Sequence, residues 1–400
     1  MSKQALSAKD IEKHFNHACL LHEHGDLQEA VKEYKSLLSI LPDLPQLHFN
    51  CGLALYELEH YQEAEEHYLS ACTLCPEDPD IHYNRGLNFR RLDQIKDAAD
   101  SFERAFQLGD HDLETYYNLG LCYQDLGEFS QAALLYDSIL STNPKHSSTL
   151  NNYAYLCHKT GDTQKAEVLY RRLLELRPEH QAARHMLNSL SGVTPDTAPL
   201  EYVEAVFDNY AQDFEHSLVE QLSYKTPLTL WERYCVLFPQ DQRKLCLDLG
   251  CGTGLAGEQF SPYCRRIIGV DISKEMLTVA EEKNLYDDLI KSDITKYLSE
   301  IRYSPDMIVA ADVFTYLGNL ETVFQKCFLV AEQGGLFLFS VEDSDNNKFE
   351  IKETGRFGHS PDYIRDLSQK TGWTLRDQHH SNLRQEKGKW ISGYLFILEK

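Results

Sequence analysis

Apolar side chains recur at every third or fourth position through the first half of the chain, with polar residues between them. This spacing indicates amphipathic helices that each bury one face. Aligned with itself, the region repeats every 34 residues from about residue 11 to residue 178, which gives five copies. Helix pairs of this period stack on one another. We therefore predict an all-α solenoid. A cap helix over 180–192 is expected to cover its end and to expose a polar face to solvent.

The same kinds of residue return at the same places in each repeat. A small residue lets the two helices of a pair approach closely, an aromatic side chain fills the gap beside it, and a proline ends the second helix. The small positions are Ala18, Gly52, Gly86, Gly120 and Ala154, then Ala30, Ala64, Ala98, Ala132 and Ala166, and the aromatic positions are Tyr34, Tyr68, Phe102, Tyr136 and Tyr170.

The pattern changes after residue 190, where "SGVTPDTAPLEY" (191–202) has the composition of an interdomain linker. The short apolar runs "KLCLDLG", "RRIIGVDIS", "DDLIKSDI", "DMIVAADV" and "GLFLFSVE" then alternate with helical stretches, which predicts a parallel, Rossmann-like α/β sheet. The last residues, 374–400, indicate two antiparallel strands joined by a charged turn. We predict a repeat domain over 1–192, a linker over 193–202 and an α/β domain over 203–400.

The net charge of −23 is spread over both halves of the chain. A strongly acidic field repels phosphate backbones, so we expect no nucleic-acid partner. It favours a basic protein or peptide at encounter, although solubility alone explains the charge at least as well.

The chain has no apolar run of 18 residues and no hydrophobic segment near its N-terminus, so neither a membrane span nor a signal peptide is expected. Its eleven cysteines fall mostly within helical and strand patterns. An odd number without a signal peptide predicts reduced thiols in the cytoplasm. Cys72 and Cys75 form a C-x-x-C pair, but no second pair completes a metal site, and we predict none.

The stretch "CLDLGCGTGLAGEQF" (246–260) contains two overlapping glycine patterns. One pattern runs from Asp248 through Gly250 and Gly252 to Gly254, and the other runs from Gly252 through Gly254 to Gly257. In both, glycines at the end of the first strand let the backbone turn sharply and approach a ligand. The second pattern is also that of dinucleotide-binding proteins, so NAD and S-adenosylmethionine are both candidate ligands.

Three features favour S-adenosylmethionine. Asp248 lies inside the first strand, where dinucleotide folds keep an apolar residue. Asp293 ends the third strand, where it can accept a hydrogen bond from an adenine amino group. The terminal antiparallel strands stand where a dinucleotide-binding domain has a further crossover to a parallel strand. Asp271, at the end of the second strand, suits the ribose hydroxyls of either ligand and does not discriminate.

Residues 200–400 resemble class I S-adenosylmethionine-dependent methyltransferases, and the segments "VFDNYAQDFEHSLVEQLSYKTP", "AADVFTYLGNLE" and "ETGRFGHSPDYIRDL" resemble bacterial members that carry N-terminal tetratricopeptide repeats. The resemblance implies S-adenosylmethionine as cofactor and S-adenosylhomocysteine as product. The cofactor contacts that it implies are Asp248, Gly250, Cys251, Gly252 and Gly254 at the methionine part, Asp271 at the ribose, Ile272, Met276, Asp293 and Ile294 at the adenine, and Asp312 at the sulfonium.

The segment "FDNYAQDFEHSL" resembles the N-terminal lid of such enzymes. Tyr210 and Phe214 are then expected to close over the cofactor, where aromatic faces attract a sulfonium cation. Ordinary packing of an amphipathic helix is the open alternative.

The first half resembles tetratricopeptide repeats, whose concave groove binds extended peptides. Asparagine occupies one position of the first helix in all five copies. An amide both donates and accepts, so a ladder of amides can grip a peptide backbone without reading its sequence, as in O-linked N-acetylglucosamine transferases. Frequent asparagine at this consensus position is the alternative. The ladder comprises Asn16, Asn50, Asn84, Asn118 and Asn152.

Methyl transfer is an in-line displacement that depends mainly on positioning, and a base is needed only for a protonated nucleophile. The residues after the fourth strand are not of the N-P-P-Y type, which holds a planar amide or an adenine amine. No Pro-Cys pair follows that strand either, which disfavours methylation of cytosine C5. We predict His359 and Tyr316 as catalytic residues, with His359 as a general base or merely the entry to a helix that starts at Ser360. Arg356 and Tyr363 are candidate substrate contacts.

Three functions follow from these patterns. In the first, the repeats recruit a protein or peptide that the second domain methylates. In the second, the repeats are a scaffold for a small-molecule methyltransferase. In the third, which the intact glycine loop disfavours, the domain binds the cofactor without chemistry.

Overall fold

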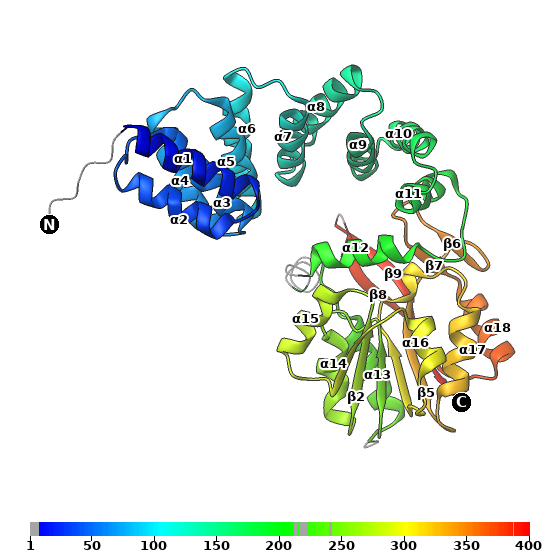
Figure 1. Cartoon of the computed structure of the whole chain (residues 1–400). Helices are drawn as coiled ribbons and strands as arrows, with labels where there is room; N and C mark the ends of the chain where they lie inside the picture. Colours follow the sequence, from blue (N-terminus) through cyan, green and yellow to red (C-terminus); the bar gives the residue numbers. More distant parts are fainter. Residues whose placement is uncertain (1–7, 212–214, 216–221, 240–241, 387) are drawn as a thin grey trace. The chain divides into compact units, whose positions relative to one another are not determined.

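The computed structural model describes residues 8–211, 215, 222–239, 242–386 and 388–400. The chain forms two compact units, Met1–Leu176 and Arg177–Lys400 (Figure 1). Each unit is a domain-sized body with its own hydrophobic core.

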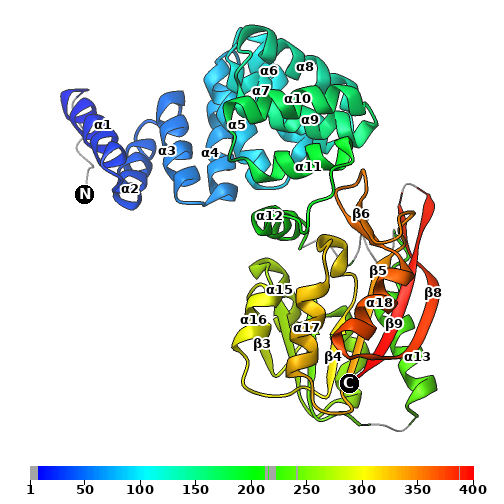
Figure 2. The same cartoon turned by 90° about the vertical axis from the view of Figure 1, so that its right-hand side faces the viewer.

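The first unit is a stack of helix pairs, as the 34-residue period predicts (Figure 2). Its described part contains ten helices: α1 (Ala8–Glu23), α2 (Leu27–Leu38), α3 (Pro45–Glu57), α4 (Tyr61–Leu74), α5 (Pro79–Arg91), α6 (Ile95–Gln107), α7 (Leu113–Asp125), α8 (Phe129–Thr142), α9 (Ser147–Thr160) and α10 (Thr163–Leu176). The predicted solenoid is therefore confirmed.

The small and aromatic positions of the repeats meet between the helices of each pair. A Cβ atom on Gly86 would lie 2.8 Å from the ring of Phe102, and one on Gly120 would lie 2.7 Å from the ring of Tyr136. Both aromatic side chains are fully buried. Glycine is thus required here for space, because its backbone conformation is an ordinary helical one.

The second unit is built on a mixed sheet in the order β3-β2-β1-β4-β5-β7-β6, with β9 antiparallel to β5 and β8 antiparallel to β9. In the described residues its strands are β1 (Cys246–Leu249), β2 (Ile267–Asp271), β3 (Asp288–Lys291), β4 (Met307–Ala310), β5 (Leu336–Glu342), β6 (Phe349–Ile351), β7 (Phe357–His359), β8 (Thr374–Glu386) and β9 (Lys389–Glu399). β1 to β5 are the five predicted apolar runs, and β8 with β9 is the predicted terminal pair. The fold class is therefore confirmed.

Helices cover both faces of this sheet, which explains why its central strands are largely apolar. α16 (Ile294–Glu300), α17 (Glu321–Val330) and α18 (Pro361–Thr371) pack on one face, and α13 (Thr226–Leu237) with α14 (Leu255–Phe260) packs on the other. α12 (Leu200–Tyr210) and α15 (Lys274–Glu282) contact each other near the strand ends (Figure 1).

α11 (Gln181–Ser191) belongs to the compact unit that begins at Arg177. Its His185 donates a hydrogen bond from Nε2 to the carbonyl of Gly355, at 2.7 Å, in the turn between β6 and β7. The following linker is also attached, because the Ala198 amide donates to the Tyr316 carbonyl at 3.0 Å. The domain limits at residues 192 and 203 stay a prediction.

Within the described residues, no helix has the length and apolar character needed to cross a membrane. The same residues contain no group of three or more His, Cys, Asp or Glu side chains arranged to hold a metal ion.

Candidate functional site

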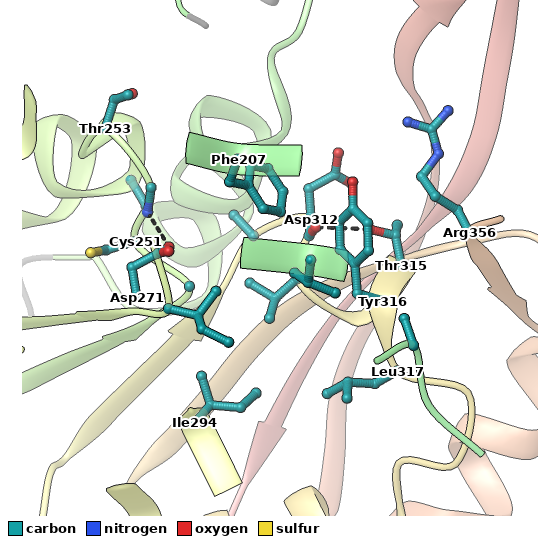
Figure 3. Close-up of a pocket in the computed structure, with 18 of the residues that line it drawn as sticks. Phe207, Cys251, Thr253, Asp271, Ile294, Asp312, Thr315, Tyr316, Leu317 and Arg356 are labelled. Carbon is teal, nitrogen blue, oxygen red and sulfur yellow. Dashed lines mark hydrogen bonds between the residues drawn. The ribbon is translucent and has the colours of Figure 1, made fainter. Parts of the chain in front are cut away.

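A pocket lies at the carboxyl ends of the parallel strands, beside the point where the strand order reverses between β1 and β4. Such a switch point is where open α/β sheets bind ligands. The loop after β1 with Asp271 lies on one side of the pocket, and Phe207, Asp312 and Tyr316 lie on the other (Figure 3). The predicted residues that line it are Gly250, Cys251, Gly252, Asp271, Ile272, Asp293, Ile294, Asp312, Tyr316 and Arg356.

The loop after β1 can be made only with glycine at several positions. Gly250, Gly252 and Gly254 have φ angles of 67°, 52° and 93°. L-residues with side chains rarely adopt such angles. A Cβ atom on Gly250 would also lie 2.5 Å from Cγ2 of Val313. The conformation of the loop and its close packing against Val313 therefore both favour glycine.

Asp271, at the end of β2, fixes this loop to the neighbouring strand. Its Oδ2 accepts a hydrogen bond from the Gly252 amide and its Oδ1 accepts one from the Ser273 amide, both at 2.9 Å (Figure 3 shows the first). Burial raises the pKa of Asp271, and these amide donors oppose that effect. The carboxylate lines the pocket while its position is set by two backbone groups.

Asp248 lies in β1 behind the loop and is not among the lining residues. Its side chain is fully enclosed, at 1% exposure, and Oδ2 accepts a hydrogen bond from the Tyr286 hydroxyl at 2.7 Å. Oδ1 has no hydrogen-bond partner among the described residues. Burial raises the pKa of Asp248 to about 7, and Tyr286 opposes the increase.

Three of the four residues predicted at the adenine lie in the pocket. Ile272, Asp293 and Ile294 line it. Asp293 also begins α16, since its Oδ1 accepts from the Lys296 amide at 2.8 Å. Met276 is completely buried and does not line the pocket.

Of the two predicted lid residues, Phe214 and the side chain of Tyr210 lie outside the described residues. α12 instead contributes Phe207, whose ring lies edge-on to Tyr316 with 5.2 Å between centroids. Val203 and Leu200, one and two turns earlier, line the same wall. These two residues and Phe207 have the spacing of one apolar helix face, which is visible in the sequence. Periodicity alone, however, does not show that this face lines the pocket.

Asp312 follows β4 in a left-handed backbone conformation, with a φ angle of 63°. Its amide donates to Ser340 Oγ at 2.8 Å, and its Oδ2 accepts from Arg384 at 2.5 Å. Its Oδ1 is buried and has no hydrogen-bond partner among the described residues. Burial raises the pKa of Asp312, and the Arg384 guanidinium opposes this.

Arg384 of β8 joins several carboxylates beside the pocket. It is 2% exposed and pairs with Glu342 of β5, with Glu386 at 2.9 Å, and with Asp312. Arg356 pairs with the same two glutamates. The sequence motifs point to Arg356 but not to Arg384, since nothing local marks a buried arginine within a charged segment.

His359 and Tyr363 are not among the lining residues. His359 is fully buried and donates from Nε2 to the Gly318 carbonyl at 2.9 Å, and burial lowers its pKa to about 4. The Tyr363 hydroxyl accepts from the Leu320 amide at 3.0 Å. Both side chains therefore support the loop that follows Tyr316.

The five asparagines of the predicted ladder lie on α1, α3, α5, α7 and α9. Two of them bridge consecutive repeats, because Asn118 donates to the Tyr83 hydroxyl at 3.4 Å and Asn152 donates to the Tyr117 hydroxyl at 2.8 Å. Asn84 donates to a carbonyl of its own helix at 2.8 Å. Part of the amide hydrogen-bonding capacity is thus used within the solenoid.

Family comparisons match both units. Residues 247–339 match a model described as a methyltransferase domain. Residues 20–59 and 52–93 match a TPR repeat model, and residues 83–146 and 135–168 match tetratricopeptide repeat models.

Two yeast proteins are among the similar curated proteins. The probable S-adenosylmethionine-dependent methyltransferase CRG1 of Saccharomyces cerevisiae is 32% identical over 134 residues, which cover 32% of this chain and 45% of that protein. The uncharacterized methyltransferase C1347.09 of Schizosaccharomyces pombe is 49% identical over 104 residues, which cover 23% of this chain and 37% of that protein. The chain thus spans less than half the length of either relative.

The enclosure of Asp248 makes folding stability depend on pH. Its pKa is about 7 in the folded protein against an ordinary 3.8, so between these values the native state holds a proton that the unfolded chain has lost. This contribution to the free energy of unfolding therefore falls as pH rises, by at most about 1.4 kcal/mol per pH unit. The difference in stability between Asp248→Asn and the wild type, measured by thermal unfolding, should therefore shift in favour of the variant as pH rises from 5 to 8.

The exposed Asp366 of α18 provides the control, since Asp366→Asn is expected to keep a constant difference from the wild type over this range. A pH-independent difference for Asp248→Asn would show that the carboxyl is not titrating there.

Proposed function

We propose that this chain, in which tetratricopeptide repeats precede a methyltransferase domain, transfers a methyl group from S-adenosylmethionine to a protein or peptide that the repeats recruit. The observation that carries the proposal is the glycine loop held by Asp271 at the rim of a pocket, opposite Asp312. The name of the Saccharomyces relative, a probable S-adenosylmethionine-dependent methyltransferase, supports the choice of cofactor.

The residues of the pocket fit this cofactor. Gly250 and Gly252 bring backbone without side chains to the lining of the pocket, and the Asp271 carboxylate retains lone pairs for ribose hydroxyls. Ile272 and Ile294 offer apolar surfaces to a planar base. The residues that would hold the cofactor are therefore Gly250, Cys251, Gly252, Asp271, Ile272, Asp293 and Ile294.

Two buried polar atoms of the lining also support a bound ligand, because they lack hydrogen-bond partners within the described part of the chain. Thr253 Oγ1 and Asp312 Oδ1 have no hydrogen-bond partner among the described residues. Buried polar groups without partners are costly and are typical of functional sites. An amino-acid group and a sulfonium supply a partner and a compensating charge for such atoms.

When bound, the cofactor supplies a methyl group activated on a positively charged sulfur. The chain's own contribution is orientation, exclusion of water and acceptance of a proton. The apolar wall of Leu200, Val203, Phe207 and Leu317 excludes water from the acceptor side. The faces of the Phe207 and Tyr316 rings, both of which line the pocket, are the surfaces that attract a cation.

We assign proton acceptance to Asp312 rather than to His359. Oδ1 of Asp312 is at the pocket and unpartnered among the described residues, and a carboxyl whose pKa is raised by burial is a better base near neutral pH than an ordinary one. The His359 ring is engaged with Gly318 and has a pKa lowered to about 4. Tyr316 and Arg356 remain candidates for orienting the acceptor.

The repeat domain supports recruitment of an extended peptide. Two pairs of its side chains, Tyr83 with Asn118 and Tyr117 with Asn152, are hydrogen-bonded across consecutive repeats. Such a surface offers amide and hydroxyl groups to a peptide backbone, and the acidic charge of the chain favours a basic peptide. The alternative is a small-molecule methyltransferase with the repeats as a scaffold.

Replacing Asp271 tests the cofactor site. Asp271→Asn cannot accept two amide hydrogen bonds and offers no charge to the ribose hydroxyls, so the affinity for S-adenosylhomocysteine should fall about 10- to 100-fold, an effect of about 1.5–3 kcal/mol for hydrogen bonds to a charged group. Isothermal titration calorimetry measures the change. Asp366→Asn is the matched control and should bind like the wild type. Equal affinity in both variants contradicts the assignment.

Replacing two groove asparagines tests recruitment. In a lysate supplied with methyl-labelled S-adenosylmethionine, the wild type should label protein bands, and Asn84→Ala combined with Asn118→Ala should lose them while binding S-adenosylhomocysteine normally. The control is Gln62→Ala with Gln131→Ala, which removes two exposed amides from the second helices α4 and α8. Label confined to small molecules supports the scaffold alternative instead.

A further inference from the structure

Tyr286 lies just before β3, beneath the glycine loop and outside the pocket lining. Its hydroxyl donates a hydrogen bond to Oδ2 of Asp248 at 2.7 Å and accepts one from the Gly257 amide at 3.2 Å. One hydroxyl group therefore joins the buried carboxylate of β1 to the helix that follows the glycine loop.

The Tyr286 ring occupies space that three glycines leave open. A Cβ atom would lie 2.6 Å from the ring at Gly257, 3.1 Å at Gly254 and 3.0 Å at Gly269. Gly257 has no positive φ angle, so its small size rather than its conformation is required. The third glycine of the dinucleotide-like pattern thus makes room for a tyrosine.

We propose that Tyr286 is a positioning residue for the cofactor loop and couples the affinity of that loop for a sulfonium ligand to the protonation of Asp248. The inference rests on the proposed function, since it takes S-adenosylmethionine as the ligand. It adds a residue that touches neither the pocket nor the reacting atoms.

The first part of the coupling is mechanical. Asp271 holds the loop at Gly252, and Tyr286 holds the helix that follows the loop at Gly257, on the other side of Gly254. Two anchors on neighbouring strands leave the intervening glycines fewer conformations, and a loop that is already ordered loses less entropy when a ligand binds.

The second part is electrostatic. Burial raises the pKa of Asp248, and of the groups that face it, the Tyr286 hydroxyl lowers this pKa and the negative charge of Asp271 raises it. A cation in the pocket favours ionised Asp248, so sulfonium affinity should rise with pH through the neutral range.

Three further titratable groups lie in the field of Asp248, namely the thiols of Cys246 and Cys251 and the hydroxyl of Tyr224. A hydrogen bond with Cys264 and burial raise the pKa of Cys246, and burial raises the pKa of Cys251 and of Tyr224. All three therefore stay neutral around pH 7, which leaves Asp248 as the group of this set that changes charge there.

S-adenosylmethionine and S-adenosylhomocysteine separate the two parts, because they differ by the methyl group and its positive charge. For the full chain, the ratio of the two affinities should increase in favour of the sulfonium from pH 6 to pH 8. In Tyr286→Phe, which keeps the ring, both affinities should fall about tenfold through loss of a hydrogen bond to a charged group. The rise in the ratio should also move to higher pH, since the carboxylate has lost a donor.

Calorimetric titrations of the wild type, Tyr286→Phe and Tyr303→Phe with both ligands at pH 6, 7, 8 and 9 provide the test. Tyr303 is a matched control, because its hydroxyl is hydrogen-bonded to Tyr297 at 2.6 Å and it does not line the pocket. Asp248→Asn keeps an acceptor for Tyr286 and removes the titration of this carboxyl, so its affinity ratio should change less with pH than that of the wild type. This variant keeps the test decisive if Tyr286→Phe fails to fold.

Each outcome has one meaning. A wild type that binds neither ligand overturns the proposed function. A wild type that binds both, with Tyr286→Phe unchanged in affinity and pH dependence, overturns the inference alone. Weaker binding of both ligands with no displacement of the pH dependence overturns the coupling to Asp248.

Discussion

The carboxylate of Asp271 ties the turn after β1 to the turn after β2 through the amides of Gly252 and Ser273, and the shape of the pocket depends on this pair of hydrogen bonds. Glycine adopts positive φ angles without strain but is flexible, so neighbouring groups must fix the conformation of this loop. Asp271 supplies that constraint from one side, and Val313, which fills the space a side chain at Gly250 would need, supplies it from the other. The methyltransferase domain thereby presents bare backbone to a ligand at the switch point of its sheet.

The opposite side of the pocket depends on charge. Arg384 brings together carboxylates that follow β4, end β5 and end β8, and so keeps Asp312 in an unfavourable backbone conformation with one oxygen free. Buried ion pairs stabilise little by themselves, but removing one partner is costly, so such a network fixes geometry. The linker and α12 add apolar residues to this side, so the segment that follows the repeats forms part of the pocket lining.

Features with a local or periodic signal were predictable from sequence. The small and aromatic positions of the repeats, the five parallel strands and the terminal antiparallel pair all follow from spacing. Gly250 and Asp271 follow from their places at strand ends, and Ile294 follows from the family resemblance. Long-range contacts left no such signal. Arg384 looks like a residue of a charged turn until the distant carboxylates of Asp312 and Glu342 join it. Likewise, the sequence around Gly257 fits a dinucleotide pattern or a helix, but neither interpretation reveals that this glycine makes room for Tyr286.

Our central claim is a pocket built for S-adenosylmethionine rather than for a dinucleotide. A crystal structure of the chain with S-adenosylhomocysteine measures this most directly. We predict the ribose hydroxyls on Asp271, the adenine between Ile272 and Ile294, and the sulfur facing Asp312. A structure in which the glycine loop holds no ligand at saturating S-adenosylhomocysteine, or holds the pyrophosphate of NAD in a parallel experiment, would contradict the claim.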